Sequence, residues 1–240
     1  TTVRGGICGA CINAEKKKHI NFKERQEWLT QYIRDNKTHP VYDCLVGVSG
    51  GKDSHMIVKR LVENHGCKNI LLGNMTDEFT KTRAGEHNLK NLAERFNCDM
   101  ITYRFNPQTF KDKAREGLEQ DLFFFFFFED RVYKTSFDIA RKFGIWLVFY
   151  VKNAEFEYGS AEELDIFHPL SDKDTKLIYL GAIWPYSIAD SLSCAREAGF
   201  IDLDYYNEWQ RQGQLESYTQ IDSIGYITAV WCKYPKFGFQ

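Results

Sequence analysis

The chain has 240 residues, enough for one large α/β domain or for a domain with a small appendage. Its 31 basic and 33 acidic residues nearly cancel, so it lacks the broad positive charge typical of proteins that bind nucleic acid through the phosphate backbone. No apolar run is long enough to cross a membrane, and residues 1–18 contain no apolar signal-peptide core. We therefore expect a cytoplasmic protein that contacts no membrane.

The first 20 residues are polar and are expected to form a loop or a small metal-binding knuckle. Cys8 and Cys11 stand in the sequence Gly-Ile-Cys-Gly-Ala-Cys, and this spacing can present two thiolates to zinc. A closed zinc site needs four ligands, and the other five cysteines supply no second pair. Two interpretations stay open: half of a zinc site, or two unpaired thiols. An odd, scattered set of seven cysteines favours a reducing compartment over a disulfide framework.

The next segments alternate between strand and helix patterns. Residues 21–36 carry apolar side chains at helical spacing, and residues 42–48 have the length and β-branched content of a buried strand. A Ser-Gly-Gly turn then leads into a helix, whose N-cap we expect to be Asp53 or Ser54. Further strands are predicted over 69–74, 99–105 and 145–151, with helices over 82–96, 108–120, 133–143 and 188–198. The alternation predicts an α/β fold: a doubly wound, mostly parallel sheet with right-handed crossovers.

Two stretches do not follow this alternation. Residues 123–128 are six consecutive phenylalanines, for which periodicity does not distinguish helix from strand; we expect them in the core or at an interface between subunits of a homo-oligomer. Residues 160–180 are charged and are expected to form a flexible excursion. We divide the chain into an N-terminal C-x-x-C segment with its helix (1–36), an α/β domain (37–160) and a C-terminal, helical extension (161–240) that completes the substrate side.

The turn after the first strand has the composition of a phosphate-binding loop. Residues 48–54 read Val-Ser-Gly-Gly-Lys-Asp-Ser, in which adjacent glycines let backbone N–H groups converge and the following helix adds partial positive charge. In a parallel sheet, this loop falls at the carboxyl ends of the strands, where ligands bind. Its spacing matches neither a Walker loop nor a dinucleotide fingerprint.

The hexapeptide Ser-Gly-Gly-Lys-Asp-Ser resembles the PP-loop of the N-type ATP pyrophosphatases, whose pattern is S-G-G-x-D-S after the first strand. This resemblance implies an adenine nucleotide alpha-hydrolase-like fold and cleavage of ATP, with Mg²⁺, between its α- and β-phosphates. A substrate oxygen becomes adenylated, pyrophosphate leaves, and a nucleophile displaces AMP. The resemblance implies catalytic roles for Ser49, Lys52, Asp53 and Ser54, with Asp53 orienting the loop or a Mg²⁺ ion. The expected ATP-binding residues are Val48, Ser49, Gly50, Gly51, Lys52, Asp53 and Ser54, together with Asn74 at the end of the second strand.

Other motifs resemble one branch of this superfamily, the N-acetyl sugar amidotransferases of surface-polysaccharide, lipopolysaccharide and nonulosonic-acid pathways. They are the Cys8–Cys11 pair, Gly-Glu-His-Asn-Leu at 85–89, Phe-Asn-Pro at 105–107, Asn-Ala-Glu-Phe-Glu-Tyr-Gly at 153–159 and Lys-Phe-Gly-Phe at 236–239. The resemblance implies that the acetamido group of a free or nucleotide-linked sugar becomes an acetamidino group, with ammonia supplied by a separate glutamine amidotransferase. It places substrate-binding residues at Asn153, Glu157, Tyr158 and Gly159.

Two other functions stay open. A C-x-x-C pair beside a PP-loop also fits an adenylating enzyme that thiolates tRNA, although the near-neutral charge argues against a nucleic-acid substrate. The second is a nucleotide-binding module without catalytic activity.

Overall fold

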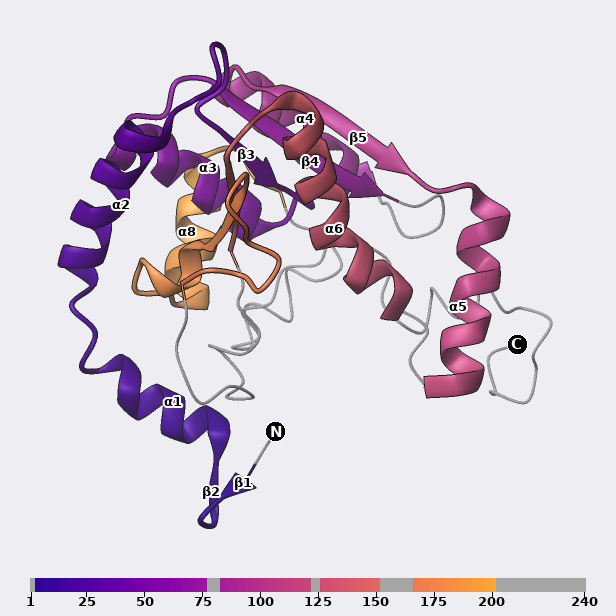
Figure 1. Ribbon diagram of the computed structural model, residues 1–240, viewed down its shortest axis with the longest axis horizontal. Helices are drawn as coiled ribbons and strands as arrows, with labels where there is room; N and C mark the ends of the chain where they lie inside the picture. The colour runs from indigo at the N-terminus through magenta and orange to yellow at the C-terminus, as the bar shows by residue number, and fades with distance from the viewer. Residues whose placement is uncertain (1–2, 77–82, 122–125, 152–165, 202–240) are drawn as a thin grey trace.

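The computed structural model describes residues 3–76, 83–121, 126–151 and 166–201 (Figure 1). Its centre is a five-stranded sheet in the order β5-β4-β3-β6-β7, and every neighbouring pair is parallel. The strands are β3 (Cys44–Gly47), β4 (Ile70–Thr76), β5 (Asp99–Arg104), β6 (Leu147–Tyr150) and β7 (Lys176–Tyr179). The predicted parallel α/β fold is confirmed.

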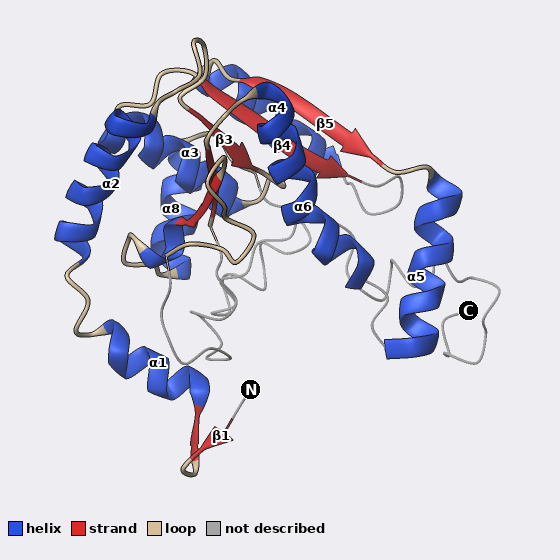
Figure 2. Cartoon of the chain, in the orientation of Figure 1, coloured by secondary structure: helices blue, strands red, loops and turns tan. Residues whose placement is uncertain are grey.

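Helices cover both faces of this sheet, as the doubly wound prediction requires (Figure 2). One face packs against α2 (Phe22–Asn36), α3 (Lys52–His65) and α4 (Arg83–Phe96), with α8 (Ile188–Glu197) packed against α3. The other face packs against α6 (Phe126–Phe143), which in turn contacts α5 (Pro107–Asp121). All of these helices but the start of α6 lie close to their predicted positions.

The alternation of side chains along β3 explains why the sheet needs cover on both faces. Val46 points into the larger core with α3 and Trp184, whereas Leu45 points into the smaller one with Phe137 of α6. Burial of a large apolar side chain contributes about 1.5–3 kcal/mol. A strand buried on both faces must therefore read as a continuous apolar run, which is the pattern that predicted it.

Three expectations need correction or refinement. Helix α3 begins at Lys52 with Gly51 as its N-cap, so Asp53 and Ser54 are not caps; their side chains accept hydrogen bonds from other groups instead. The excursion predicted over 160–180 is wrong for Lys176–Tyr179, which form β7. Its short apolar run directly follows the charged stretch 172–176, so the pattern around it reads as polar. The phenylalanine tract is helical from Phe126 onward, while residues 122–125 lie outside the described residues.

The N-terminal segment is also more ordered than predicted. Strands β1 (Val3–Arg4) and β2 (Ile7–Cys8) pair as an antiparallel hairpin, and helix α1 (Gly9–Lys17) follows where a loop was expected. Cys8 caps the helix through its Sγ atom, which accepts the Cys11 N–H, and Lys16 and Lys17 complement the helix dipole in the last turn. Figure 1 shows this hairpin and α1 lying away from the sheet.

The division at residues 36 and 160 stays a prediction. Nonetheless, β7 belongs to the same sheet as the strands of the predicted α/β domain. Along the described parts of the chain, no helix combines the length and apolar character needed to span a membrane.

A buried histidine joins three elements on the α3 side of the sheet. The His65 Nδ1 atom lies 2.8 Å from Thr30 Oγ1 of α2, and its Nε2 atom accepts the indole N–H of Trp184 at 3.1 Å. Burial lowers the pKa of His65 to about 4, and that of His55 on the same helix also to about 4. Both imidazoles are therefore neutral in the folded protein at neutral pH.

We expect the free energy of unfolding to fall as the pH is lowered from 6.5 to 4. Unfolded histidines take up a proton below about pH 6.5, whereas these two stay neutral in the folded state until about pH 4, so protons favour the unfolded state. Each histidine contributes up to about 1.4 kcal/mol per pH unit in this window. Urea unfolding at several pH values measures the slope. The slope should become shallower in His65→Gln. It should stay unchanged in the control His19→Gln, which alters an exposed side chain. Equal slopes in the parent and both variants would contradict the prediction.

Candidate active site

The predicted phosphate loop lies at the carboxyl edge of the sheet. Residues 48–51 connect the end of β3 directly to the first turn of α3 at Lys52. The amide N–H groups in the first turn of a helix have no carbonyl partner within the helix, and the helix dipole adds partial positive charge there. The arrangement suits an anion, as the sequence predicted.

The hydroxyl oxygens of the two loop serines each accept a backbone N–H of the loop. Ser54 Oγ accepts the Ser49 N–H at 3.0 Å, Ser49 Oγ accepts the Gly51 N–H at 3.3 Å, and the two hydroxyl oxygens are 3.5 Å apart. Ser54 is buried while Ser49 is exposed. Ser54 thus closes the turn from inside, and Ser49 presents its hydroxyl at the surface of the loop.

Gly50 is the residue that lets the turn close. Its φ of +84° lies in the left-handed region, where other residues are strained. A Cβ atom at this position would lie 2.9 Å from Leu89 Cγ and 3.2 Å from the Gly85 carbonyl oxygen of α4. Both the backbone conformation and the close approach of α4 therefore require glycine.

A tyrosine ring supports the base of the loop. A Cβ atom at Gly47 would lie 2.1 Å from Tyr150 Cζ, so the ring occupies the space where a side chain would stand. The Tyr150 hydroxyl donates to the Val132 carbonyl at 2.8 Å and lies 2.7 Å from Ser136 Oγ, which fixes the ring in place. Burial raises the pKa of Tyr150, so it stays neutral.

Asn74, predicted from its place at the end of the second strand, does lie against the loop. Its Nδ2 atom donates to the Val48 carbonyl at 2.8 Å. Its Oδ1 atom is buried and has no hydrogen-bond partner among the described residues. Buried acceptors without a partner are rare, and one beside a phosphate loop is a place for a donor from a ligand or water.

Asp53 is held by residues that sequence reasoning missed. Its Oδ1 atom accepts hydrogen bonds from Ser191 Oγ of α8 at 2.6 Å and from Tyr186 Oη at 2.9 Å, and Lys52 Nζ lies 3.6 Å from Oδ2. Hydrogen bonds to a carboxylate are among the stronger ones in proteins. Tyr186 and Ser191 are more than 130 residues away along the chain, and no motif in the sequence marks them.

The other predicted site residues are those of the 153–159 motif and the Cys8–Cys11 pair. Asn153, Glu157, Tyr158 and Gly159 lie outside the described residues. The Cys8 and Cys11 sulfur atoms are 3.0 Å apart, and the hydrogen bond that the two thiols share raises the pKa of Cys11. Within the described ranges, no third His, Cys, Asp or Glu joins them to form a metal-binding group, so zinc stays a prediction.

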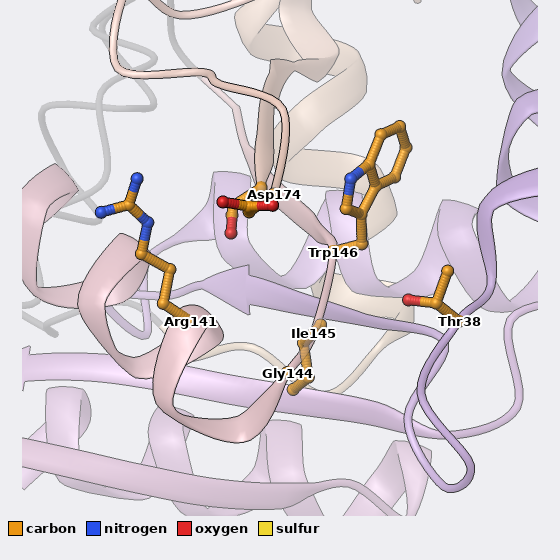
Figure 3. A pocket seen from close by; sticks show the side chains of 7 residues that line it. Thr38, Arg141, Gly144, Ile145, Trp146 and Asp174 are labelled. Carbon is orange, nitrogen blue, oxygen red and sulfur yellow. The ribbon is translucent and has the colours of Figure 1, made fainter.

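A cavity of about 440 Å³ lies at the opposite edge of the sheet (Figure 3). Its lining comes mainly from the segments that lead into β6 and β7, including Trp146 and Asp174. Arg141 also lines it and pairs with Asp172. Because phosphate binding in parallel sheets occurs at the carboxyl ends of the strands, this cavity is not part of the loop site.

No protein family and no curated protein matches the sequence. Among solved structures, NMN synthetase from Francisella tularensis is 14% identical, covering 92% of this chain and 83% of that one with a TM-score of 0.50. NH3-dependent NAD synthetase from Campylobacter jejuni, in complex with nitrate, is 13% identical, covering 91% and 85% with a TM-score of 0.49. The likeness to NMN synthetase shows a shared fold.

We expect Gly50→Ala to lower the free energy of unfolding by about 1–3 kcal/mol and to weaken ATP binding at least tenfold. The left-handed backbone becomes strained, and the new methyl group meets Leu89. Urea unfolding and calorimetric titration with ATP measure the two effects. Gly66→Ala is the control, because Gly66 has a φ of +70° but nothing within 4 Å of its Cβ position. It should cost about 1–2 kcal/mol and leave ATP binding intact. Equal ATP affinity in both variants would overturn the prediction.

We expect Ser191→Ala to reduce ATP affinity about five- to tenfold and to cost about 1.5–3 kcal/mol of stability, because Asp53 loses its shorter hydrogen bond. Ser187→Ala is the matched control on the same helix. It removes the N-cap of α8, whose Oγ accepts the Asp190 N–H, and should cost about 1 kcal/mol of stability without touching Asp53. The prediction fails if Ser187→Ala weakens ATP binding as much as Ser191→Ala does.

Proposed function

We propose that this chain is an ATP pyrophosphatase-type enzyme, which adenylates a substrate oxygen and releases AMP and pyrophosphate. The geometry of the loop carries the proposal: the hexapeptide Ser-Gly-Gly-Lys-Asp-Ser lies between a parallel strand and a helix N-terminus, and Ser54 closes it on the Ser49 N–H. The fold shared with NMN synthetase supports it further.

The residues present fit a bound pyrophosphate. The backbone N–H groups in the first turn of α3 and the hydroxyl of Ser49 are donors that stay fixed while negative charge develops on the leaving group. Stabilisation of that charge by fixed donors is the electrostatic contribution that matters most for this chemistry. The buried side chain of Lys52 adds a positive charge next to the loop. The orphan acceptor of Asn74 lies at the start of the loop, available to a donor on the nucleotide.

Asp53 orients the loop in this proposal. Its Oδ1 atom accepts two hydroxyl donors from the region of α8, and these bonds fix the carboxylate relative to the start of α3. Mg²⁺ bound with ATP would neutralise charge on the phosphate oxygens. Asp53 is the carboxylate within the loop that could contribute an oxygen ligand to this ion.

The substrate class we propose is an N-acetyl sugar, free or nucleotide-linked. The acetamido oxygen attacks the α-phosphorus of ATP and pyrophosphate leaves. Ammonia then attacks the activated carbon and AMP leaves, so that the oxygen departs with AMP and an acetamidino group remains. The proposal rests on the motif at 153–159 and the other resemblances along the chain. An amide carbonyl resists ammonia until its oxygen becomes a good leaving group, and water must be kept away because it would regenerate the amide.

We propose a separate glutamine amidotransferase as the ammonia donor. No Cys-based glutaminase triad is recognisable in the sequence, which is consistent with imported ammonia.

The proposal is tested by incubating the purified protein with ATP, Mg²⁺, ammonia and a panel of acetamido sugars, and by measuring AMP, pyrophosphate and the sugar masses. We expect AMP and pyrophosphate in equal amounts and a sugar lighter by about one mass unit, the difference between oxygen and NH. If no sugar in the panel supports AMP formation, N-acetyl sugars are excluded as the substrate class. AMP formation with tRNA in their place would favour the thiolating alternative, and ATP binding without any AMP would favour a non-catalytic module.

We expect Ser54→Ala to lower the rate of AMP formation on the order of 100-fold, because the hydroxyl that closes the loop is lost. Ser171→Ala is the matched control. Ser171 also binds backbone groups through its hydroxyl, donating to the Leu177 carbonyl and accepting its N–H, but it lies on the segment before β7. It should retain full activity. Full activity in Ser54→Ala, with a melting temperature equal to that of the parent, would refute the assignment of the loop.

A further inference from the structure

His55 follows the phosphate loop directly and is fully buried in the first turns of α3. Its Nδ1 atom lies 3.1 Å from the carbonyl oxygen of Gly51, the last residue of the loop and the N-cap of α3. Its Nε2 atom lies 3.3 Å from Nδ2 of Asn91 on α4. The imidazole therefore stands between the loop and a second helix.

The hydrogen-bond partners determine where the proton on this ring resides. Asn91 Nδ2 donates to the Ala198 carbonyl at 2.8 Å, which identifies that atom as the amide nitrogen. An amide nitrogen accepts no hydrogen bond, so its second hydrogen points to His55 Nε2, which must accept. The Gly51 carbonyl is also an acceptor, so Nδ1 carries the proton and donates to it. Burial lowers the pKa of His55 to about 4, which keeps the ring in this neutral form at neutral pH.

The segment after α8 holds Asn91 in place. The backbone there turns through Gly199, whose φ is +85° and whose Cβ position lies only 2.7 Å from Asn91 Oδ1. Phe200 then packs edge-on against the His55 ring, with 5.4 Å between centroids. These contacts form a hydrogen-bond relay, which runs from the end of α8 through Asn91 and His55 to the loop.

The peptide bond transmits this constraint into the loop. A trans peptide points its N–H away from its carbonyl, so fixing the Gly51 carbonyl also fixes the direction of the Lys52 N–H at the start of α3. The His55 N–H of the backbone also reaches the Gly51 carbonyl, but at 3.3 Å. The side chain therefore adds a second donor to the carbonyl that orients the phosphate cradle.

We propose that His55 is a positioning residue for the phosphate loop: in the Nδ1-protonated form selected by Asn91, it fixes the Gly51 peptide so that the N-terminus of α3 faces the departing pyrophosphate. This inference rests on the proposed function for its kinetic consequence. The hydrogen-bond relay itself is a property of the fold and can be measured without any substrate.

A pair of substitutions separates the two ring nitrogens. In His55→Asn, the amide nitrogen takes approximately the place of Nδ1 and can still donate to Gly51. In His55→Gln, it takes approximately the place of Nε2, so the bond to Gly51 is lost. We expect His55→Gln to raise the KM for ATP about tenfold in the AMP-forming assay, with a smaller effect on kcat, and His55→Asn to stay within about threefold of the parent.

His65→Gln is the control for a purely structural effect, because it removes a second buried histidine from the same helix. His65 contacts Thr30 and Trp184 and does not touch the loop. It should lower the melting temperature and leave the KM for ATP unchanged. An unchanged KM in a folded His55→Gln variant, or an equal rise in His65→Gln, would overturn the proposal.

Nitrogen NMR of ¹⁵N-histidine-labelled protein tests the relay independently of activity. We expect a protonated Nδ1 and an unprotonated Nε2 for His55, and a shift toward the other tautomer in Asn91→Leu, which removes the donor to Nε2. A protonated Nε2 in the parent would overturn the proposal. If the parent forms no AMP with any substrate while the NMR result holds, the proposed function fails and the relay stands.

Discussion

The hydrogen bond from the Ser49 amide to the Ser54 hydroxyl joins the end of β3 to the start of α3, and the rest of the site is arranged around this short turn. The turn is possible because Gly50 adopts a left-handed conformation against α4. A loop this tight has few stable conformations, and its donors point in set directions. Preorganised donors stabilise developing charge without rearranging during the reaction, which is what release of pyrophosphate requires.

Every surrounding layer of the fold restrains the loop. Tyr150 of β6 fills the space beneath Gly47, and Leu89 of α4 closes over Gly50. Ser191 of α8 binds Asp53, and the backbone after the same helix reaches His55 through Asn91. The region after β7 thus acts on the loop at two points, although it lies more than 130 residues later in the chain. The packing of α8 is therefore coupled directly to the loop.

Several features were accessible from the sequence because they depend on local chemistry. The strands β3, β4 and β6 are buried on both faces, so their apolar runs are continuous. The glycines of the loop stand out in the sequence because neighbouring groups leave no room there for a side chain. By contrast, the apolar run of β7 directly follows the charged stretch 172–176, and α1 is capped by a cysteine, Cys8, rather than by a conventional capping residue. Asp53 and Ser54 were expected as caps because their types favour that role, but tertiary partners use their side chains instead.

The parallel α/β fold and the position of the phosphate loop at Ser49 to Ser54 could be inferred from local patterns, because hydrophobic periodicity and the turn chemistry of glycine act over a few neighbouring residues. The groups that hold that loop are set by tertiary contacts. Tyr150, Tyr186, Ser191 and the pair of His55 and Asn91 carry no local pattern that marks them. Their roles arise from hydrogen bonds and contacts between segments far apart in the chain, and only the folded sheet and its helices bring those segments together.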